Sequence, residues 1–352
     1  MYQTLGDFVQ DLDRRAELVR ITEPISPLLE ITEITDRVSK SRCANDPGDW
    51  ARRTDPRFWD RGGHALLFEN VVNPDGSRSP FPVLINAFGS YSRMAMALHC
   101  GADLPGVSSG IPGGFEAIGH RIGELVKPEP PKGIREAIAK ARQFAPLLKI
   151  GPKRGKSGVC QEVVHTGDAI DLTTIPALRC WPHDGDYHAL GYPHPAQLND
   201  PIPRITPYDQ AEASGLRGRY ITLAGIHTIH ADDADAKKPS SHNIGMYRVQ
   251  MLGRDRVAMH WHMHHDGANH WRSWKRKGQR MPVAIALGGE SVLPYAATAP
   301  LPPGISELLM AGFLNSTYTL ILFHMLGYLL FEYQEELGFA SDLKDDTEAA
   351  DT

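Results

Sequence analysis

The chain contains little cysteine and no cysteine motif. Only four cysteines occur in 352 residues, and they are widely separated, at Cys43, Cys100, Cys160 and Cys180. A zinc knuckle needs closely paired cysteines, and a small secreted domain needs a denser disulfide framework, so neither class is indicated. This usage is typical of a reducing compartment, and we expect a cytoplasmic protein.

A strong excess of charge is also missing. The 37 Lys and Arg residues against 42 Asp and Glu residues give a net charge of −5. Proteins that bind nucleic acid usually carry a basic surface, so we expect no nucleic-acid partner. The fractions of hydrophobic residues, 41%, and charged residues, 22%, are near the globular average and argue against disorder over the whole chain. A small-molecule partner is favoured.

Long apolar runs are almost absent. The first residues, MYQTLGDFVQDLDRR, are acidic and amphipathic, so we expect no signal peptide. Residues 308–331 carry no charge and are long enough to span a bilayer. Polar residues inside this run, such as Asn315, Thr317 and His324, make it a poor span. Membrane association therefore remains an alternative to a purely cytoplasmic location.

Helical and strand patterns alternate in the first part of the chain. Helices are predicted from about Leu5 to Leu12, at residues 30–39 and at 92–98, and strands at residues 18–21, 65–68 and 82–86. This alternation predicts an α/β domain over residues 1–130. The proline-rich stretch 126–133 is expected to connect this domain to the next one.

The pattern changes after a helix predicted at residues 134–148. Short β-like runs separated by Gly, Pro and Asp follow at residues 159–164, 220–230, 244–251, 257–261 and 283–287. They predict an antiparallel sheet or a barrel in a second domain over residues 131–314. We expect residues 171–207 to form a long ordered loop and residues 232–239 a hairpin tip. The fold class is therefore α+β.

Histidine is concentrated in one segment. Six of the 16 histidines lie between His242 and His270. A strand over residues 257–262 would place His260 and His262 on one face, because successive side chains alternate. Imidazole is the commonest neutral metal ligand, but no HExxH or Cys/His zinc spacing is present. A metal site and a His-rich polar sheet face that binds nothing both remain open.

The hexapeptide NIGMYR, at residues 243–248, carries a second set of polar groups. Asn243 offers an amide oxygen, and Gly245 allows close approach of backbone or ligand. Arg248 offers a planar guanidinium suited to a carboxylate or a phosphate. A hairpin edge with one exposed arginine is the simpler interpretation of the hexapeptide alone. Its position next to the histidine cluster favours a functional site.

These residues resemble a known family. The segment NIGMYRVQMLGRDRVAMHWHMHHDGANHW resembles the cofactor-binding segment of the UbiD family, the prenylated-flavin-dependent decarboxylases. Further segments resemble that family in the same order: ELVRITEPISPLLEITEITDR, GGHALLFENV, PVLINAFGS, KPEPPKG and IPALRCWPHDG. The resemblance runs from about Tyr2 to Leu314.

The resemblance implies a fold and a set of ligands. The N-terminal α/β domain would be followed by a split β-barrel of the flavin-reductase type that holds prenylated FMN with a divalent metal, usually Mn²⁺, and K⁺. By motif position, Asn243 and His264 match the metal ligands. Cofactor contacts are implied at Met246, Tyr247, Arg248, His260, Trp261, His262, His265 and Asp266. Arg248 would also face the substrate carboxylate, as the catalytic residue. Some relatives have arginine where this chain has His260.

The resemblance also implies an activity. Family members are carboxy-lyases that remove CO₂ from an aromatic or α,β-unsaturated carboxylic acid without oxidation, through an adduct with the prenylated FMN. Quinone biosynthesis, of ubiquinone or menaquinone, is the pathway implied here. A flavin prenyltransferase would supply the cofactor, and the family forms homo-oligomers.

The sequence departs from the family after Leu314. Family members continue with a metal-ligating Glu, an acidic proton donor and a third α/β domain used in oligomerisation, whereas residues 315–352 do not align. We therefore expect an incomplete barrel without the third domain and without its contacts for a homo-oligomer. Residues 317–331 are predicted to pack as a helix, and residues 338–352 to stay mobile. An inactive flavin- or metal-binding remnant and a degenerate enzyme anchored at the membrane remain as alternatives.

Overall fold

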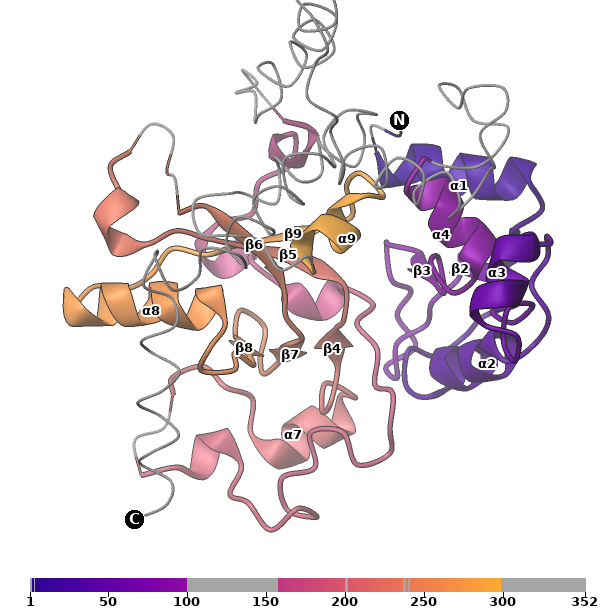
Figure 1. Cartoon of the computed structure of the whole chain (residues 1–352). Coiled ribbons are helices and arrows are strands. Elements are labelled where there is room, and N and C mark those ends of the chain that lie inside the picture. Colours follow the sequence, from indigo (N-terminus) through magenta and orange to yellow (C-terminus); the bar gives the residue numbers. More distant parts are fainter. Residues whose placement is uncertain are drawn as a thin grey trace, which may run out of the picture.

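The structure is a computed structural model that describes residues 4–99, 158–199, 202–236 and 241–298, together with residues 2 and 239. Figure 1 shows two neighbouring parts, an α/β part formed by the described residues up to 99 and a second part rich in β-strands formed by the described residues from 158 to 298. The predicted connection 126–133, the helix 134–148, the uncharged run 308–331 and the tail 315–352 all lie outside the described residues, as do both predicted domain boundaries.

The α/β part has the predicted alternation of helices and strands. Its elements are α1 (Leu5–Arg14), β1 (Leu18–Ile21), α2 (Glu30–Ser39), α3 (Asp49–Thr54), β2 (Ala65–Phe68), β3 (Val83–Ile85) and α4 (Tyr91–Ala97). Strand β2 lies in the centre of the sheet, parallel to β1 and antiparallel to β3. All four side chains of β2 are buried, which explains its continuous apolar sequence ALLF. Only α3 was not predicted.

Local sequence explains where α1 begins. The hydroxyl of Thr4 accepts a hydrogen bond from the backbone N–H of Asp7, while the Asp7 side chain accepts one from the backbone N–H of Thr4. This reciprocal capping box satisfies two N–H groups that a helix start otherwise leaves without partners. One turn further on, Phe8 and Leu12 point into the core and are fully buried.

A buried ion pair connects three segments of the α/β part. The side chains of Glu17 and Arg93 are both 0% exposed, and Arg93 Nη1 lies 2.9 Å from Glu17 Oε2. Arg93 also donates to the backbone carbonyls of Gly63 and Gly62, at 2.6 and 2.8 Å. Glu17 accepts a further hydrogen bond from Ser92 Oγ at 2.7 Å. The pair therefore joins the residue before β1, the loop before β2 and helix α4.

The second part contains two three-stranded antiparallel sheets, in the orders β4-β7-β8 and β6-β5-β9. Its strands and α-helices are α7 (Tyr208–Ala213), β4 (Tyr220–Ile221), β5 (Ala224–Thr228), β6 (Asn243–Met246), β7 (Val249–Met251), β8 (Val257–Met259), α8 (Asp266–Arg276), β9 (Ala284–Leu287) and α9 (Leu293–Ala297). Short 3₁₀-helices lie at Val159–Gln161, Gly167–Ala169, Leu172–Thr174, Pro195–Gln197 and Ala231–Asp233.

The predicted antiparallel arrangement is confirmed, with two corrections. Residues 159–164 are not a strand but begin with a 3₁₀-helix, and Val163 and Val164 are 73% and 69% exposed with no strand pairing beside them. The second correction concerns β8, which ends at Met259 rather than continuing to residue 261 or 262. Its partner β7 begins at Val249, so residues beyond Met259 have no strand opposite them.

Strands from both sheets bury their apolar side chains together. Ala224, Ile226 and Val249 are the buried residues of this core, and Tyr247 and Met259 pack against them. The two sheets are thus layers around one core, as expected for a mixed α+β fold. Over the described residues each sheet stays open, and a closed barrel is not formed there.

The two parts also share a core. Leu178, from the long loop of the second part, is buried in one cluster with Ile31, Leu66 and Phe68 of the α/β part. Next to it, the backbone of Arg179 accepts from Leu29 N–H and donates to the carbonyl of Pro27, at 2.9 and 3.1 Å. Within the described ranges, no helix combines the length and the apolar composition required to cross a membrane.

Candidate functional site

Five of the predicted site residues form a cluster of rings at the beginning of α8. The ring centroids of Tyr247 and Trp261 are 6.0 Å apart, and those of Tyr247 and His265 are 5.2 Å apart. His262 lies 5.2 Å from His264 and 5.7 Å from His265. We call these five residues the ring cluster. Its members come from the segment after β6 and from the turn between β8 and α8.

A histidine turn leads the chain from β8 into α8. His265 Nδ1 accepts a hydrogen bond from the backbone N–H of His262 at 3.1 Å, and the backbone N–H of His265 donates to the His262 carbonyl at 3.0 Å. Because the imidazole of His265 is used in this way, it does not cap the helix that begins at Asp266. The first N–H groups of α8 therefore have no side-chain cap. A helix start of this kind favours the binding of an anion.

Two glycines allow this close packing. A Cβ atom at Gly245 would lie 2.3 Å from the ring of Tyr247, and a Cβ atom at Gly267 would lie 3.1 Å from the ring of Trp261. Asn243, at the start of β6, approaches the same helix, since its Nδ2 lies 3.5 Å from Asp266 Oδ2. Asn243 and Asp266 thus lie at the same helix start as the ring cluster.

Arg248 and His260 lie outside the ring cluster. The backbone N–H of His260 donates to the Arg248 carbonyl at 3.4 Å, and both side chains are exposed to solvent. No other described residue forms an ion pair with Arg248. The pKa of Tyr220 is raised by burial, and the positive charge of Arg248 acts in the opposite direction. Arg248 therefore offers an exposed cation without an ion-pair partner among the described residues.

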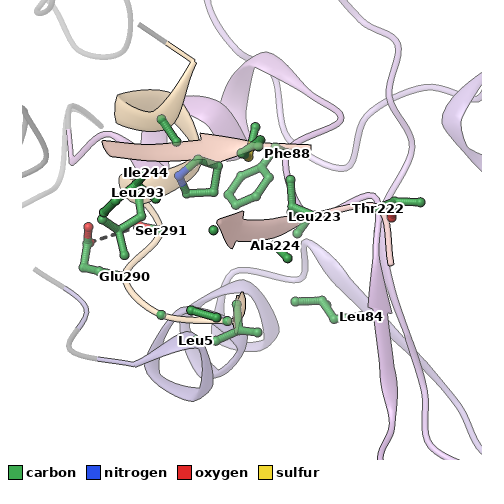
Figure 2. A pocket seen from close by; sticks show the side chains of 18 of the residues that line it. Leu5, Leu84, Phe88, Thr222, Leu223, Ala224, Ile244, Glu290, Ser291 and Leu293 are labelled. Carbon is green, nitrogen blue, oxygen red and sulfur yellow. Dashed lines mark hydrogen bonds between the residues drawn. The ribbon is translucent and has the colours of Figure 1, made fainter. Parts of the chain in front are cut away.

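Met246 faces a different environment from the ring cluster. Side chains alternate along β6, and Ile244 and Met246 line a cavity of about 390 Å³ on the face away from Asn243 and Gly245. Figure 2 shows Leu5, Leu84 and Phe88 from the α/β part around this cavity, together with residues of the second part. Of the predicted site residues, Met246 is the one that lines it. The predicted residues are therefore divided between two faces of one strand.

Sequence reasoning missed the cavity and the histidine beside it. His227 on β5 lines the cavity, and its Nδ1 lies 3.1 Å from Nε2 of His242. Burial lowers the pKa of both imidazoles. The cavity forms only where the two parts meet, so no local motif could indicate it. In the sequence, the cavity is indicated only by a histidine within the mainly apolar strand pattern at residues 224–228.

The described residues fit a flavin phosphate better than they fit a metal ion. Trp261 Nε1 is buried and has no hydrogen-bond partner among the described residues, and the uncapped start of α8 adds N–H donors beside it. Asn243 and His264 provide only two metal ligands. Elsewhere in the described part no group of three His, Cys, Asp or Glu residues could hold a metal. The roles predicted for Asn243 and His264 remain predictions.

Structural comparison supports the fold class. The vanillic acid decarboxylase of Sedimentibacter hydroxybenzoicus, in closed form, has a TM-score of 0.57 at 20% identity, covering 89% of this chain and 48% of that chain. The apo 3,4-dihydroxybenzoic acid decarboxylase of Klebsiella pneumoniae has a TM-score of 0.51 at 18% identity, covering 89% and 49%. The mixed α+β fold predicted from the sequence is thus confirmed.

Sequence comparison identifies the family. Residues 9–105 match the N-terminal domain of 3-octaprenyl-4-hydroxybenzoate carboxy-lyase, named UbiD_N, and residues 153–322 match its Rift-related domain, named UbiD. An uncharacterized protein of Aquifex aeolicus (strain VF5) is 40% identical over 313 residues, which are 88% of this chain and 49% of that protein. The chain spans about half the length of this curated relative. With both family domains matched in order along it, the chain belongs to the UbiD family.

Proposed function

We propose that the protein is a decarboxylase of the UbiD type, a carboxy-lyase acting on an aromatic or α,β-unsaturated carboxylic acid with prenylated FMN as its cofactor. The observation that carries this proposal is Arg248, an exposed guanidinium without an ion pair among the described residues, in the segment that matches the family. A guanidinium binds a carboxylate through two parallel hydrogen bonds, which orients the acid as well as attracting it.

The residues at the start of α8 would hold the phosphate end of the cofactor. Peptide N–H groups at a helix start and the indole N–H of Trp261 are donors suited to phosphate oxygens. Asn243 and His264 would bind a divalent metal such as Mn²⁺ together with phosphate and water, and K⁺ would bind nearby. When bound, the prenylated flavin would supply the electron sink that decarboxylation requires.

Finer features of the proposed function rest on the family. Both matching domains are named after 3-octaprenyl-4-hydroxybenzoate, so we infer a ring acid of this kind and a role in quinone biosynthesis. A flavin prenyltransferase would supply the cofactor. Assembly into a homo-oligomer and the split-barrel topology belong to the same proposal.

CO₂ release tests this function. The full chain would be produced together with a flavin prenyltransferase, and its bound flavin identified by mass spectrometry. It would then be incubated with 4-hydroxybenzoate and with cinnamate, one acid of each proposed class. We expect CO₂ release from at least one of them. A chain that retains prenylated flavin and releases no CO₂ from either acid would instead be a cofactor-binding protein without turnover.

Retention of the cofactor tests the proposed phosphate and metal site. Replacing both Asn243 and His264 with alanine should lower the occupancy of flavin and of manganese together, by about tenfold or more, because the metal and the phosphate would share these ligands. Flavin absorbance and elemental analysis of the purified protein measure the two occupancies. The control is His183→Ala, which removes an exposed imidazole from the long loop. Flavin occupancy equal to that of the control would contradict the assignment.

A further inference from the structure

The cavity beside Met246 is lined by both parts of the molecule. The α/β part contributes Leu5, Leu84 and Phe88, and the second part contributes apolar side chains such as Leu223 and Leu293 (Figure 2). Its volume of about 390 Å³ is in the range of sites that bind small molecules. Apolar walls of this kind suit a ring-sized molecule, which gains affinity by leaving water.

Most polar side chains in this cavity are already hydrogen-bonded to the protein. Asn86 Nδ2 donates to the carbonyls of Gly62 and His64, at 2.7 and 2.8 Å. Ser291 Oγ donates to the Ala97 carbonyl at 2.9 Å. The Asn86 bonds lie within the α/β part, and the Ser291 bond joins the second part to it. Few polar groups are left for a ligand.

Thr222 and His227 are the exceptions, and of the two Thr222 is exposed to solvent. The imidazole of His227 has one nitrogen in use. Its Nδ1 is bonded to His242, whereas its Nε2 lies 3.7 Å from the position of a Cβ atom on Gly225, which also lines the cavity. No described residue forms a hydrogen bond with this Nε2. The imidazole is therefore fixed through one nitrogen and presents the other to the cavity.

The charges around the cavity disfavour an anion. Its described lining contains no lysine or arginine, and it contains one carboxylate, that of Glu290. Burial lowers the pKa of His227 and of His242, so both rings are neutral at neutral pH. A carboxylate or phosphate would therefore find no cation here, in contrast to the surroundings of Arg248.

A neutral histidine pair can adapt to a hydroxyl group. If His227 Nδ1 donates to His242, then His227 Nε2 is an acceptor, and if His242 donates, Nε2 carries the proton and is a donor. A hydroxyl group is itself both donor and acceptor, so it can bond to either tautomer. We propose that this cavity is a binding site for a neutral, hydroxyl-bearing apolar molecule of one or two rings, anchored at His227. This proposal does not depend on the proposed decarboxylation.

Fluorescence titration of the full chain with 2-naphthol, 2-naphthoate and naphthalene at pH 7.5 tests the site. 2-Naphthol should bind at least about tenfold more tightly than 2-naphthoate, because the anion has no cationic partner in the cavity. His227→Leu should weaken 2-naphthol binding about five- to tenfold, the value of one neutral hydrogen bond, and leave naphthalene binding within about twofold. His227→Gln, which keeps a polar anchor, should retain most of the affinity.

Two tryptophan variants test whether the probe binds in the cavity. Leu223 lines the cavity and is 47% exposed, so Leu223→Trp can narrow the cavity without disturbing the core. It should weaken 2-naphthol and naphthalene binding alike by about tenfold. Leu198→Trp is the matched control, since Leu198 is 43% exposed and does not line the cavity. Equal 2-naphthol affinity in His227→Leu and the wild type, unchanged binding in Leu223→Trp, or a preference for 2-naphthoate would each overturn the proposal.

Discussion

Replacing Arg93 with methionine is expected to lower the free energy of unfolding by about 3–5 kcal/mol, the usual cost of breaking a buried ion pair. The substitution removes the cation and leaves the Glu17 carboxylate fully buried beside an apolar side chain. It also removes the donors to the carbonyls of Gly62 and Gly63, just before β2. Urea denaturation followed by far-UV circular dichroism measures the change.

Two controls separate loss of the pair from loss of an arginine. Arg20→Met breaks the ion pairs with Asp13 and Glu69, but Arg20 is 42% exposed, so a much smaller loss than that of Arg93→Met is expected. Adding Glu17→Gln to Arg93→Met removes the uncompensated charge and should recover part of the stability. If Arg93→Met and Arg20→Met were equally stable, the buried pair would not stabilise the α/β part.

Arg248→Lys is expected to lower kcat/KM for CO₂ release by about 100-fold in the protein loaded with prenylated FMN, a loss of about 2.7 kcal/mol in transition-state stabilisation. Lysine keeps the positive charge but loses the planar pair of donors that would orient the carboxylate. Because Arg248 is exposed and forms no ion pair with a described residue, the thermal midpoint should change by no more than about two degrees.

The matched control for this prediction is Arg276→Lys, an exposed arginine in the last turn of α8. It should retain the wild-type kcat/KM. A thermal midpoint that falls by many degrees in Arg248→Lys, with kcat/KM unchanged, would show that Arg248 is a structural residue. The proposed role in binding the substrate carboxylate would then be wrong.

The elements whose signal is local could be predicted from the sequence. Helix α1 begins at the capping box of Thr4 and Asp7, and β2 is the buried run ALLF. The segment around β6 could be recognised because the family motif is continuous in sequence. The residues of the ring cluster are also close in sequence within that segment. Their position at one helix start could therefore be expected.

Features that depend on distant partners could not be predicted. Strand β8 ends at Met259 because its partner β7 is only three residues long. The apolar pattern of β8 alone does not indicate where its partner ends. Val163 and Val164 have strand propensity but no partner strand in the described part. The cavity lies between Leu84 of one part and Leu223 of the other, and only the docking of the two parts forms it.

The position of Leu178 has a consequence for the order of folding. All three described strands of the α/β sheet have been synthesised once residue 85 is added, and among the described residues they pair only with one another. Its core is not complete at that point, since Leu178 closes the cluster around Ile31, Leu66 and Phe68. A nascent chain must therefore carry an exposed apolar surface on this sheet while about ninety more residues are added. The α/β part reaches its final stability only after the loop that contains Leu178 has left the ribosome.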